Sequence, residues 1–359
     1  MKRLVKFLVI CLCVVGTIGC AKKTPPQEEN KTGEEKVEKQ DREQIAEIKT
    51  GLEYFVEEKV SLPEEAVNVM DVRKSGDTIL IASSEGRQKS SLIWKTDDKG
   101  ESWERVLDLP EMLQYSLVSE ALFVEDNSLI CGVQVDLLKE GADTANRQKK
   151  YYKVNLQGDF IELSSDMSNQ EISILQYYDS QIYGTNQRDG IFVFDGETGA
   201  LKESFDKMSG QINGFCIMND KIFIEGIDHI EILDALTGEP VDADEKLRGS
   251  LDPVLLKGSR TTGKQGFIDK MICDPSTGLL YYINADALYQ YDFADSEFKE
   301  VLYGKNHRFA EEEMVLMDIS SAGNHELSIV TYKNNTKDLK TPVKQEMYWY
   351  TFAPEGIES

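Results

Sequence analysis

Histidine and cysteine side chains carry most nucleophilic and metal chemistry in proteins, and this chain has few of either. Its three histidines, His229, His307 and His325, lie far apart, and the sequence contains no P-loop, G-x-S-x-G, G-x-G-x-x-G or H-E-x-x-H motif. There is no C-x-x-C pair and no Cys/His cluster, so we expect no metal site and no cofactor. The sequence therefore assigns no catalytic residue and favours a protein that is not an enzyme.

Three cysteines lie in the C-terminal three quarters of the chain, and their spacing argues against a disulfide framework. Cys131, Cys216 and Cys273 are an odd number of residues with long separations. We expect each of them to pack as a small buried apolar residue.

The cysteine with the clearest chemistry is Cys20, which follows an export signal. Lys2, Arg3 and Lys6 precede an apolar run, residues 7–15, and small residues come next, which is the layout of a signal peptide. The segment Thr17–Cys20 resembles the lipobox of bacterial lipoproteins, apart from its first position, where that family usually has Leu, Val or Ile. The resemblance implies that residues 1–19 are removed and that lipid on Cys20 anchors the protein to the outer face of the cytoplasmic membrane.

The rest of the chain divides into a tether and one large domain. Residues 20–50 are rich in Lys, Glu and Gln and almost lack aromatic side chains, so they should form a disordered, solvated tether. Residues 51–359 are long enough to hold a single large core. The net charge of −24 argues against nucleic acid or anionic lipid as the main partner.

Short β-rich runs broken by Gly, Asp and Asn repeat along this domain, with one unit at intervals of roughly 40 to 58 residues. Each unit begins with an apolar run, and these runs are 67–72, 117–124, 172–178, 212–218, 267–272 and 314–319. Four strands per unit predict an all-β fold, a single β-propeller with six blades favoured; seven blades is the alternative if two units are merged. The last unit lacks a fourth strand, and residues 54–60 could supply it and close the ring.

Turn motifs between the predicted strands support a propeller. The segment 96–103 resembles the Asp-box hairpin of sialidase-like propellers, and 195–199 and 234–238 share a D-x-x-T-G pattern that resembles turns of quinoprotein-like repeats. We interpret the residues of these motifs as structural: Asp98, Gly100, Trp103, Asp195, Gly199, Asp234 and Gly238.

The longest connections are predicted to gather at one end of the blades and to carry basic side chains. In a four-stranded blade the loops between strands two and three, and those between blades, share one end. The candidate binding face at that end consists of Lys149, Lys150, Arg260, Lys333, Lys337, Lys340 and Lys344. The turns at the opposite end, around Asp98, Asp195, Asp234 and Asp295, are acidic. An anionic partner is therefore expected to approach the basic loops.

The leader, the charged tether and the irregular propeller together are similar to the N-terminal propeller region of some Gram-positive extracellular solute-binding lipoproteins. The similarity implies a surface-anchored, non-enzymatic protein that binds a small molecule, a glycan or an envelope protein, as an accessory to solute capture. The alternative is a carbohydrate-active hydrolase of propeller fold, which would need two carboxylates roughly 5 to 10 Å apart in an axial pocket.

Overall fold

The computed structural model describes most of the chain from residue 55 onward. It covers residues 55–66, 68–84, 91–124, 127–137, 148–205, 211–212, 214–225, 230–241, 270–274, 278–284, 287–292, 297–303, 314–323, 326–333 and 344–352. The predicted signal peptide, the tether and the lipidated Cys20 lie outside these residues. Within them, no helix is long and apolar enough to cross a membrane.

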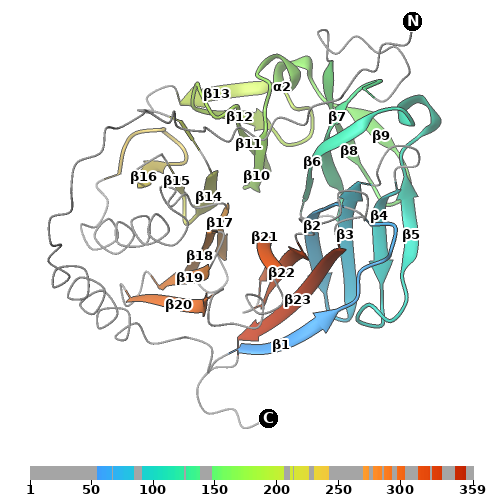
Figure 1. The fold of residues 1–359 in the computed structure, drawn as a ribbon. Coiled ribbons are helices and arrows are strands. Elements are labelled where there is room, and N and C mark those ends of the chain that lie inside the picture. Colours follow the sequence, from blue (N-terminus) through green and yellow to red (C-terminus); the bar gives the residue numbers. More distant parts are fainter. Residues whose placement is uncertain are drawn as a thin grey trace, which may run out of the picture. The chain divides into compact units, whose positions relative to one another are not determined.

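The first half of the domain forms three antiparallel sheets of four strands each (Figure 1). We call each sheet a blade and number the blades in chain order. Blade 1 contains β2 (Asn68–Ser75), β3 (Thr78–Ser84), β4 (Ser91–Thr96) and β5 (Glu104–Asp108). Blade 2 contains β6 (Leu117–Phe123), β7 (Leu129–Gln134), β8 (Lys149–Val154) and β9 (Phe160–Glu162). Blade 3 contains β10 (Ile174–Tyr178), β11 (Gln181–Thr185), β12 (Ile191–Asp195) and β13 (Leu201–Phe205). Two short helices precede blades 2 and 3: η2 (Glu111–Leu113) and α2 (Ser165–Asn169).

The second half adds three more sheets. Blade 4 has three described strands, β14 (Gly214–Met218), β15 (Lys221–Glu225) and β16 (Ile230–Asp234). Blade 5 contains β17 (Lys270–Asp274), β18 (Leu279–Asn284), β19 (Ala287–Asp292) and β20 (Glu297–Tyr303). Blade 6 contains β21 (Met314–Gly323), β22 (Glu326–Lys333), β23 (Lys344–Phe352) and β1 (Phe55–Val60). The fourth strand predicted for blade 4 is seen only as a bridge between Leu233 and Pro240, and residues 242–269 lie outside the description.

The first strands of successive sheets contact one another in a closed series. β2 contacts β6, β6 contacts β10, and the series continues through β14, β17 and β21 back to β2. Sheets whose innermost strands meet around a common centre are the arrangement of a β-propeller, so the predicted fold class is confirmed. Six sheets are seen in the part of the chain that the structure describes, and the blade count of the whole domain stays a prediction.

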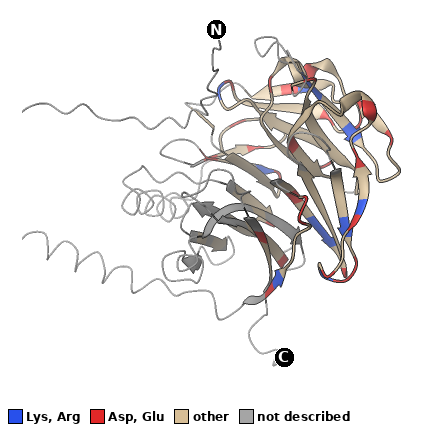
Figure 2. Cartoon of the chain, turned by 45° about the vertical axis from the view of Figure 1, so that its right-hand side comes forward, with Lys and Arg blue, Asp and Glu red and all other residues tan. Residues whose placement is uncertain are grey.

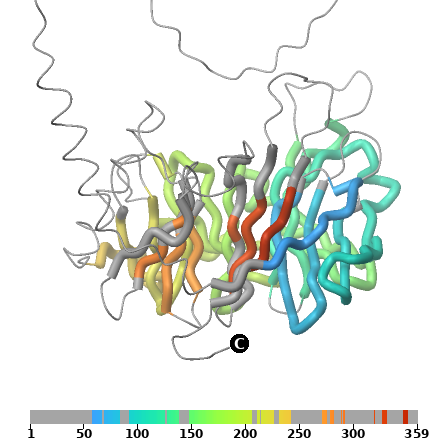
Figure 3. The backbone as a smooth tube through the Cα atoms, turned by 60° about the horizontal axis from the view of Figure 1, so that its bottom comes forward, coloured from blue at the N-terminus to red at the C-terminus, as the bar shows by residue number. Residues whose placement is uncertain are grey.

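The predicted closure of the ring by an N-terminal strand is confirmed. β1 pairs antiparallel with β23, from Phe55 opposite Phe352 to Val60 opposite Met347. Figure 3 shows this blue strand beside the red strands of the C-terminal region. Because β1 gives the last sheet its fourth strand, the outer edge of β23 is paired rather than left open.

Apolar side chains fill the spaces between neighbouring blades. Separate buried clusters join blades 1 and 2, 2 and 3, 3 and 4, 5 and 6, and 6 and 1. In the last of these, Val60 of β1 packs with Trp94 of blade 1 and with Trp349 of blade 6. Burial of one such side chain contributes on the order of 1.5 to 3 kcal/mol, so blade contacts account for much of the stability of the ring.

Candidate functional site

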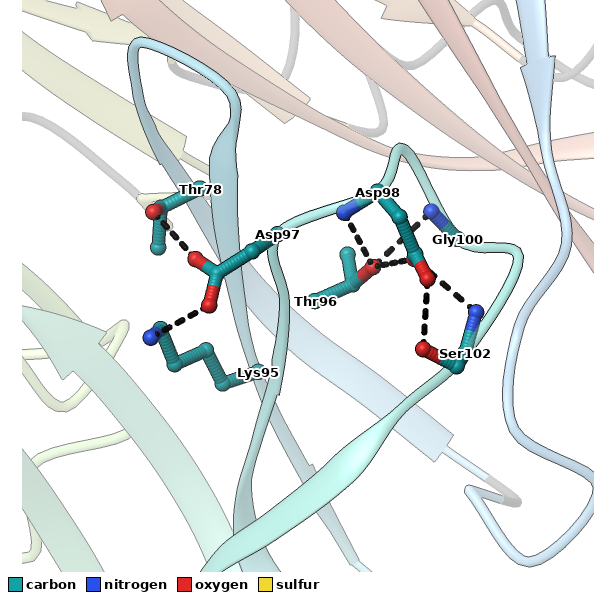
Figure 4. Close-up of polar contacts among 7 residues, drawn as sticks. All are labelled: Thr78, Lys95, Thr96, Asp97, Asp98, Gly100 and Ser102. Atoms are coloured by element: carbon teal, nitrogen blue, oxygen red, sulfur yellow. Dashed lines mark hydrogen bonds and ion pairs between the residues drawn. The ribbon is translucent and has the colours of Figure 1, made fainter.

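The Asp-box-like turn follows β4, and the side chains of Thr96, Asp98 and Ser102 meet within it (Figure 4). The side chain of Asp97 is instead directed toward Thr78 and Lys95. The Asp98 carboxylate accepts the backbone N–H of Ser102 at 2.9 Å and the hydroxyls of Ser102 and Thr96 at 2.5 and 2.6 Å. These bonds, led by the one from the Ser102 side chain, lower the pKa of Asp98 to about 2. Gly100 has a φ of 90°, which favours glycine, and its N–H donates to the Thr96 hydroxyl at 3.0 Å. These bonds give Asp98 a structural role in the turn.

The indole of Trp103 reaches beyond its own hairpin. Its Nε1–H donates to the backbone carbonyl of Ser61, 2.6 Å away. Ser61 directly follows β1, so the turn of blade 1 is bonded to the segment that closes the ring.

The two D-x-x-T-G turns repeat one pattern of hydrogen bonds. Asp195 accepts the backbone N–H and the hydroxyl of Thr198, both at 2.9 Å. Asp234 accepts the same two groups of Thr237, at 2.8 and 3.0 Å. The backbone N–H of each threonine is the main cause that holds the pKa of each aspartate below its usual value. Both carboxylates are thus ionised and engaged in structural turns.

The turn glycines lie where one blade meets the preceding blade. A side chain on Gly100, Gly199 or Gly238 would meet, respectively, Val60, Leu163 or Phe205. Each partner ends, or directly follows, the fourth strand of the preceding blade. In blades 2 and 3 the fourth strand thus ends beside a turn of the following blade. β1, the fourth strand of blade 6, ends beside the turn of blade 1 in the same way.

Lys149, which we placed on an exposed binding face, is largely buried, so that part of the prediction is wrong. Its side chain is 17% exposed, and its Nζ lies 2.6 Å from the Glu120 carboxylate. It also donates to the carbonyl of Ile172, just before blade 3, at 2.5 Å. Burial lowers the pKa of Lys149 and raises that of Glu120, and the attraction within the pair opposes both shifts. Gly132 makes this possible, because it leaves room on the middle strand for both side chains.

The other predicted lysines are described to different extents. Lys150 is more accessible, and its Nζ contacts both carboxylate oxygens of Glu162, at 2.8 and 3.0 Å. Lys333 and Lys344 are paired in register at the base of the connection between β22 and β23. Arg260, Lys337 and Lys340 lie outside the described residues, as does the acidic turn at Asp295. Figure 2 shows basic and acidic positions interleaved over the described strands.

The prediction about the cysteines is wrong for two of them. Cys216 of β14 and Cys273 of β17 form a disulfide, with their Cα atoms 5.8 Å apart. Cys131 is buried and free, as predicted, and burial raises the pKa of its thiol to about 12. A signal for the pair was present: each cysteine lies on the first strand of its unit, and the units are consecutive. Adjacent first strands meet in a propeller, so such cysteines are neighbours in space.

Several acidic side chains of low exposure also escaped the sequence analysis, and Glu120 and Glu225 are two of them. Glu120 is paired as described above, and Glu225, at the end of β15, is completely buried. Glu120 lies inside the largely apolar strand β6, and Glu225 follows three apolar residues of β15, where a carboxylate of low exposure is unusual. The described residues contain no group of three or more His, Cys, Asp or Glu side chains that could hold a metal ion.

Comparisons with known proteins add similarity of fold only. No family model matches the chain, and no curated protein matches it. Among solved structures, the WD40 domain of Neurospora crassa Pan2 is 11% identical, with 86% of this chain and 98% of that chain covered and a TM-score of 0.49. Virginiamycin B lyase from Staphylococcus aureus is 8% identical over 83% and 99% of the two chains, with a TM-score of 0.47. YCF48 bound to D1 peptide is 7% identical over 85% and 97%, with a TM-score of 0.45. At these values the similarity carries no inference about chemistry or partners.

Proposed function

We propose that this protein is a non-enzymatic propeller that is anchored by lipid to the outer face of the cytoplasmic membrane. It binds a ligand or partner protein through one end of its ring, as an accessory to solute capture. The observation that carries the proposal is the unequal length of the connections at the two ends of the blades.

The two longest connections within blades, residues 135–148 in blade 2 and 334–343 in blade 6, lie at the same end, although blade 5 has a two-residue connection there, 285–286. Within a blade, strands one and two are joined by residues 76–77, 179–180 and 219–220 in blades 1, 3 and 4. Strands two and three are joined by residues 85–90, 135–148 and 334–343 in blades 1, 2 and 6. In an antiparallel sheet these two kinds of connection lie at opposite ends, so the long ones share one end, which we call the loop end. Long loops on a rigid scaffold are the usual place for recognition.

The opposite end, which we call the turn end, is engaged in structure. Three carboxylates at this end accept hydrogen bonds within tight turns, those of Asp98, Asp195 and Asp234. The chain also joins the ring at the turn end, because Phe55 is paired with Phe352, the last residue of β23. The point at which the proposed tether joins the ring therefore lies at the turn end and not among the loops of the loop end.

The anchor is tested by removing the acylated thiol. Cells that express Cys20→Ala should release the protein from the membrane fraction or retain an uncleaved leader, because no lipid can be attached. Mass spectrometry of the wild-type N-terminus is the second measurement. A variant that stays membrane-bound with its leader removed, together with an unlipidated wild type, would show that Cys20 is not the anchor.

Binding at the loop end is tested with an acidic glycan, because the candidate residues there are cationic. The probe is polygalacturonate, and the variant reverses to Glu four lysines of one connection: Lys333, Lys337, Lys340 and Lys344. Each exposed contact is worth about 0.2 to 1 kcal/mol, so the loss of four contacts should weaken binding by roughly four- to several-hundred-fold and flatten its salt dependence.

The matched control compares pairs that change the charge equally. Lys337→Glu with Lys340→Glu should weaken binding of polygalacturonate, whereas Lys202→Glu with Lys221→Glu, on blades 3 and 4 at the turn end, should not. Equal loss in the two pairs would mean that only net charge matters. Unchanged binding in the four-lysine variant at low salt would remove the loop end as the recognition surface.

A further inference from the structure

The strand that closes the ring is attached to its blade by non-covalent contacts. The chain reaches β1 before any other blade strand, yet β1 pairs with β23 at the far end of the domain. Within the sheet, Lys59 forms an ion pair with Glu346 at 2.7 Å, and the two side chains are 49% and 10% exposed. An outermost strand of this kind is the first expected to separate from its sheet, because its amides lie nearest the solvent.

The Asp-box-like turn of blade 1 contacts this strand where it ends. A Cβ on Gly100 would lie 2.6 Å from Val60 Cγ1 and 2.9 Å from the carbonyl oxygen of Ser61. The indole of Trp103 donates to that same carbonyl at 2.6 Å. Lys99 of the same turn lies 3.3 Å from the Glu58 carboxylate. Backbone packing, a hydrogen bond and an ion pair thus connect one turn to one short segment, residues 58–61.

The turn can hold this segment because its own conformation is fixed. Thr96 and Asp98 bond to each other and, through Gly100 and Ser102, to the rest of the loop. These bonds lie within the turn and do not involve β1, so contact with β1 costs little additional conformational entropy.

The comparable turns of blades 3 and 4 lie against a different kind of partner. Gly199 and Gly238 approach Leu163, which directly follows β9, and Phe205, which ends β13. The other strands of blades 2 and 3 precede β9 and β13 in the chain. Those strands are joined covalently to the rest of their sheets by short turns, whereas β1 has no such link to β23. The full Asp-box pattern, including the tryptophan, occurs at the one turn that faces the closing strand.

We propose that the turn Thr96–Trp103 is a latch that holds the closing strand β1 and so keeps the propeller ring shut. Opening of the latch frees β1 and exposes the outer edge of β23 before the other blades separate. Since residues 1–54 precede β1, the latch also secures the point at which the ring is joined to its proposed tether.

The test is hydrogen exchange with mass spectrometry on the full chain. Trp103→Phe keeps an aromatic side chain but removes the N–H donor. Exchange in peptides covering 55–60 and 344–352 should therefore rise roughly two- to tenfold, as expected for one hydrogen bond. Gly100→Ala adds a clash and backbone strain, so the rise in the same peptides should be about tenfold or more. The matched control Gly199→Ala carries the same kind of strain at blade 3 and should leave residues 55–60 unchanged.

A rescue shows whether the effect passes through β1. Phe55 and Phe352 are register partners, so Phe55→Cys and Phe352→Cys allow a disulfide between β1 and β23. In the Trp103→Phe background this disulfide should restore the wild-type protection of β23 from hydrogen exchange. The proposal is overturned if Trp103→Phe and Gly100→Ala both leave residues 55–60 as protected as in the wild type. It is also overturned if exchange rises equally in all blades, or if the cross-link restores nothing.

Discussion

The disulfide between Cys216 and Cys273 should contribute a measurable part of the stability of the domain. The bond joins the first strands of blades 4 and 5 and closes a loop of 57 residues. In the chain-entropy model a cross-link of that length restricts the unfolded chain by about 14 cal/mol/K, or about 4 kcal/mol at 25 °C. Observed values fall below such figures when the folded state is distorted or the unfolded state retains structure, so we expect a loss of about 2 to 4 kcal/mol.

The perturbation is Cys216→Ala with Cys273→Ala, compared with the wild type before and after reduction. Alanine avoids placing a hydroxyl at Cys216, which is 1% exposed. Guanidinium unfolding followed by tryptophan fluorescence gives the free energy of unfolding and its denaturant slope. The slope should rise when the cross-link is lost, because a longer unfolded chain exposes more surface.

A control with reductant separates the disulfide from general effects of the mutations. Reduction should lower the stability of the wild type to near that of the double variant and leave the double variant unchanged. Free thiols at Cys216 and Cys273 in an unreduced digest, or a wild type unaffected by reductant, would refute the reasoning. Recovery of the intact disulfide from the purified protein would agree with the proposed export, because structural disulfides persist in oxidising compartments.

Three further predictions concern packing, pH and the closing strand. Gly132→Ala should lower the free energy of unfolding by about 1 to 3 kcal/mol, because the added Cβ would overlap the Glu120–Lys149 ion pair. Gly214→Ala, whose Cβ would have its nearest atom at 3.6 Å, should change it by less than about 0.5 kcal/mol, and equal effects of the two variants would contradict this. The pKa of Asp98 in the folded state is depressed, so the stability that its carboxylate provides is complete above pH 3.8 and is lost as the pH falls toward about 2. Asp98→Asn should flatten the dependence of Tm on pH in that window, and an unchanged curve would argue against the hydrogen bonds of the turn. Deletion of residues 21–48 should leave Tm unchanged, but deletion of residues 21–60 should lower it strongly by unpairing β23, and equal Tm values would show that β1 does not close the ring.

The sequence by itself predicted the features that depend on local chemistry. The predicted apolar run 212–218 contains β14, and the turn signals placed Asp195 and Asp234 where their carboxylates accept neighbouring N–H groups. These outcomes follow from alternation of apolar residues and from turn chemistry, both of which act over a few residues. The closing strand β1 was also predictable, because a unit that lacks one strand leaves an edge that the other end of the domain can pair.

Only the tertiary structure decided which distant groups meet. Whether Cys216 meets Cys273 depends on the side-by-side placement of two strands 57 residues apart, which spacing alone does not reveal. Lys149 lies at the base of a loop, and the sequence predicts that it is exposed. Its side chain is instead largely buried, because it pairs with the Glu120 carboxylate in the space that Gly132 leaves open. A long flexible side chain can lie in solvent or in a gap between blades, and the choice is made by partners from other strands.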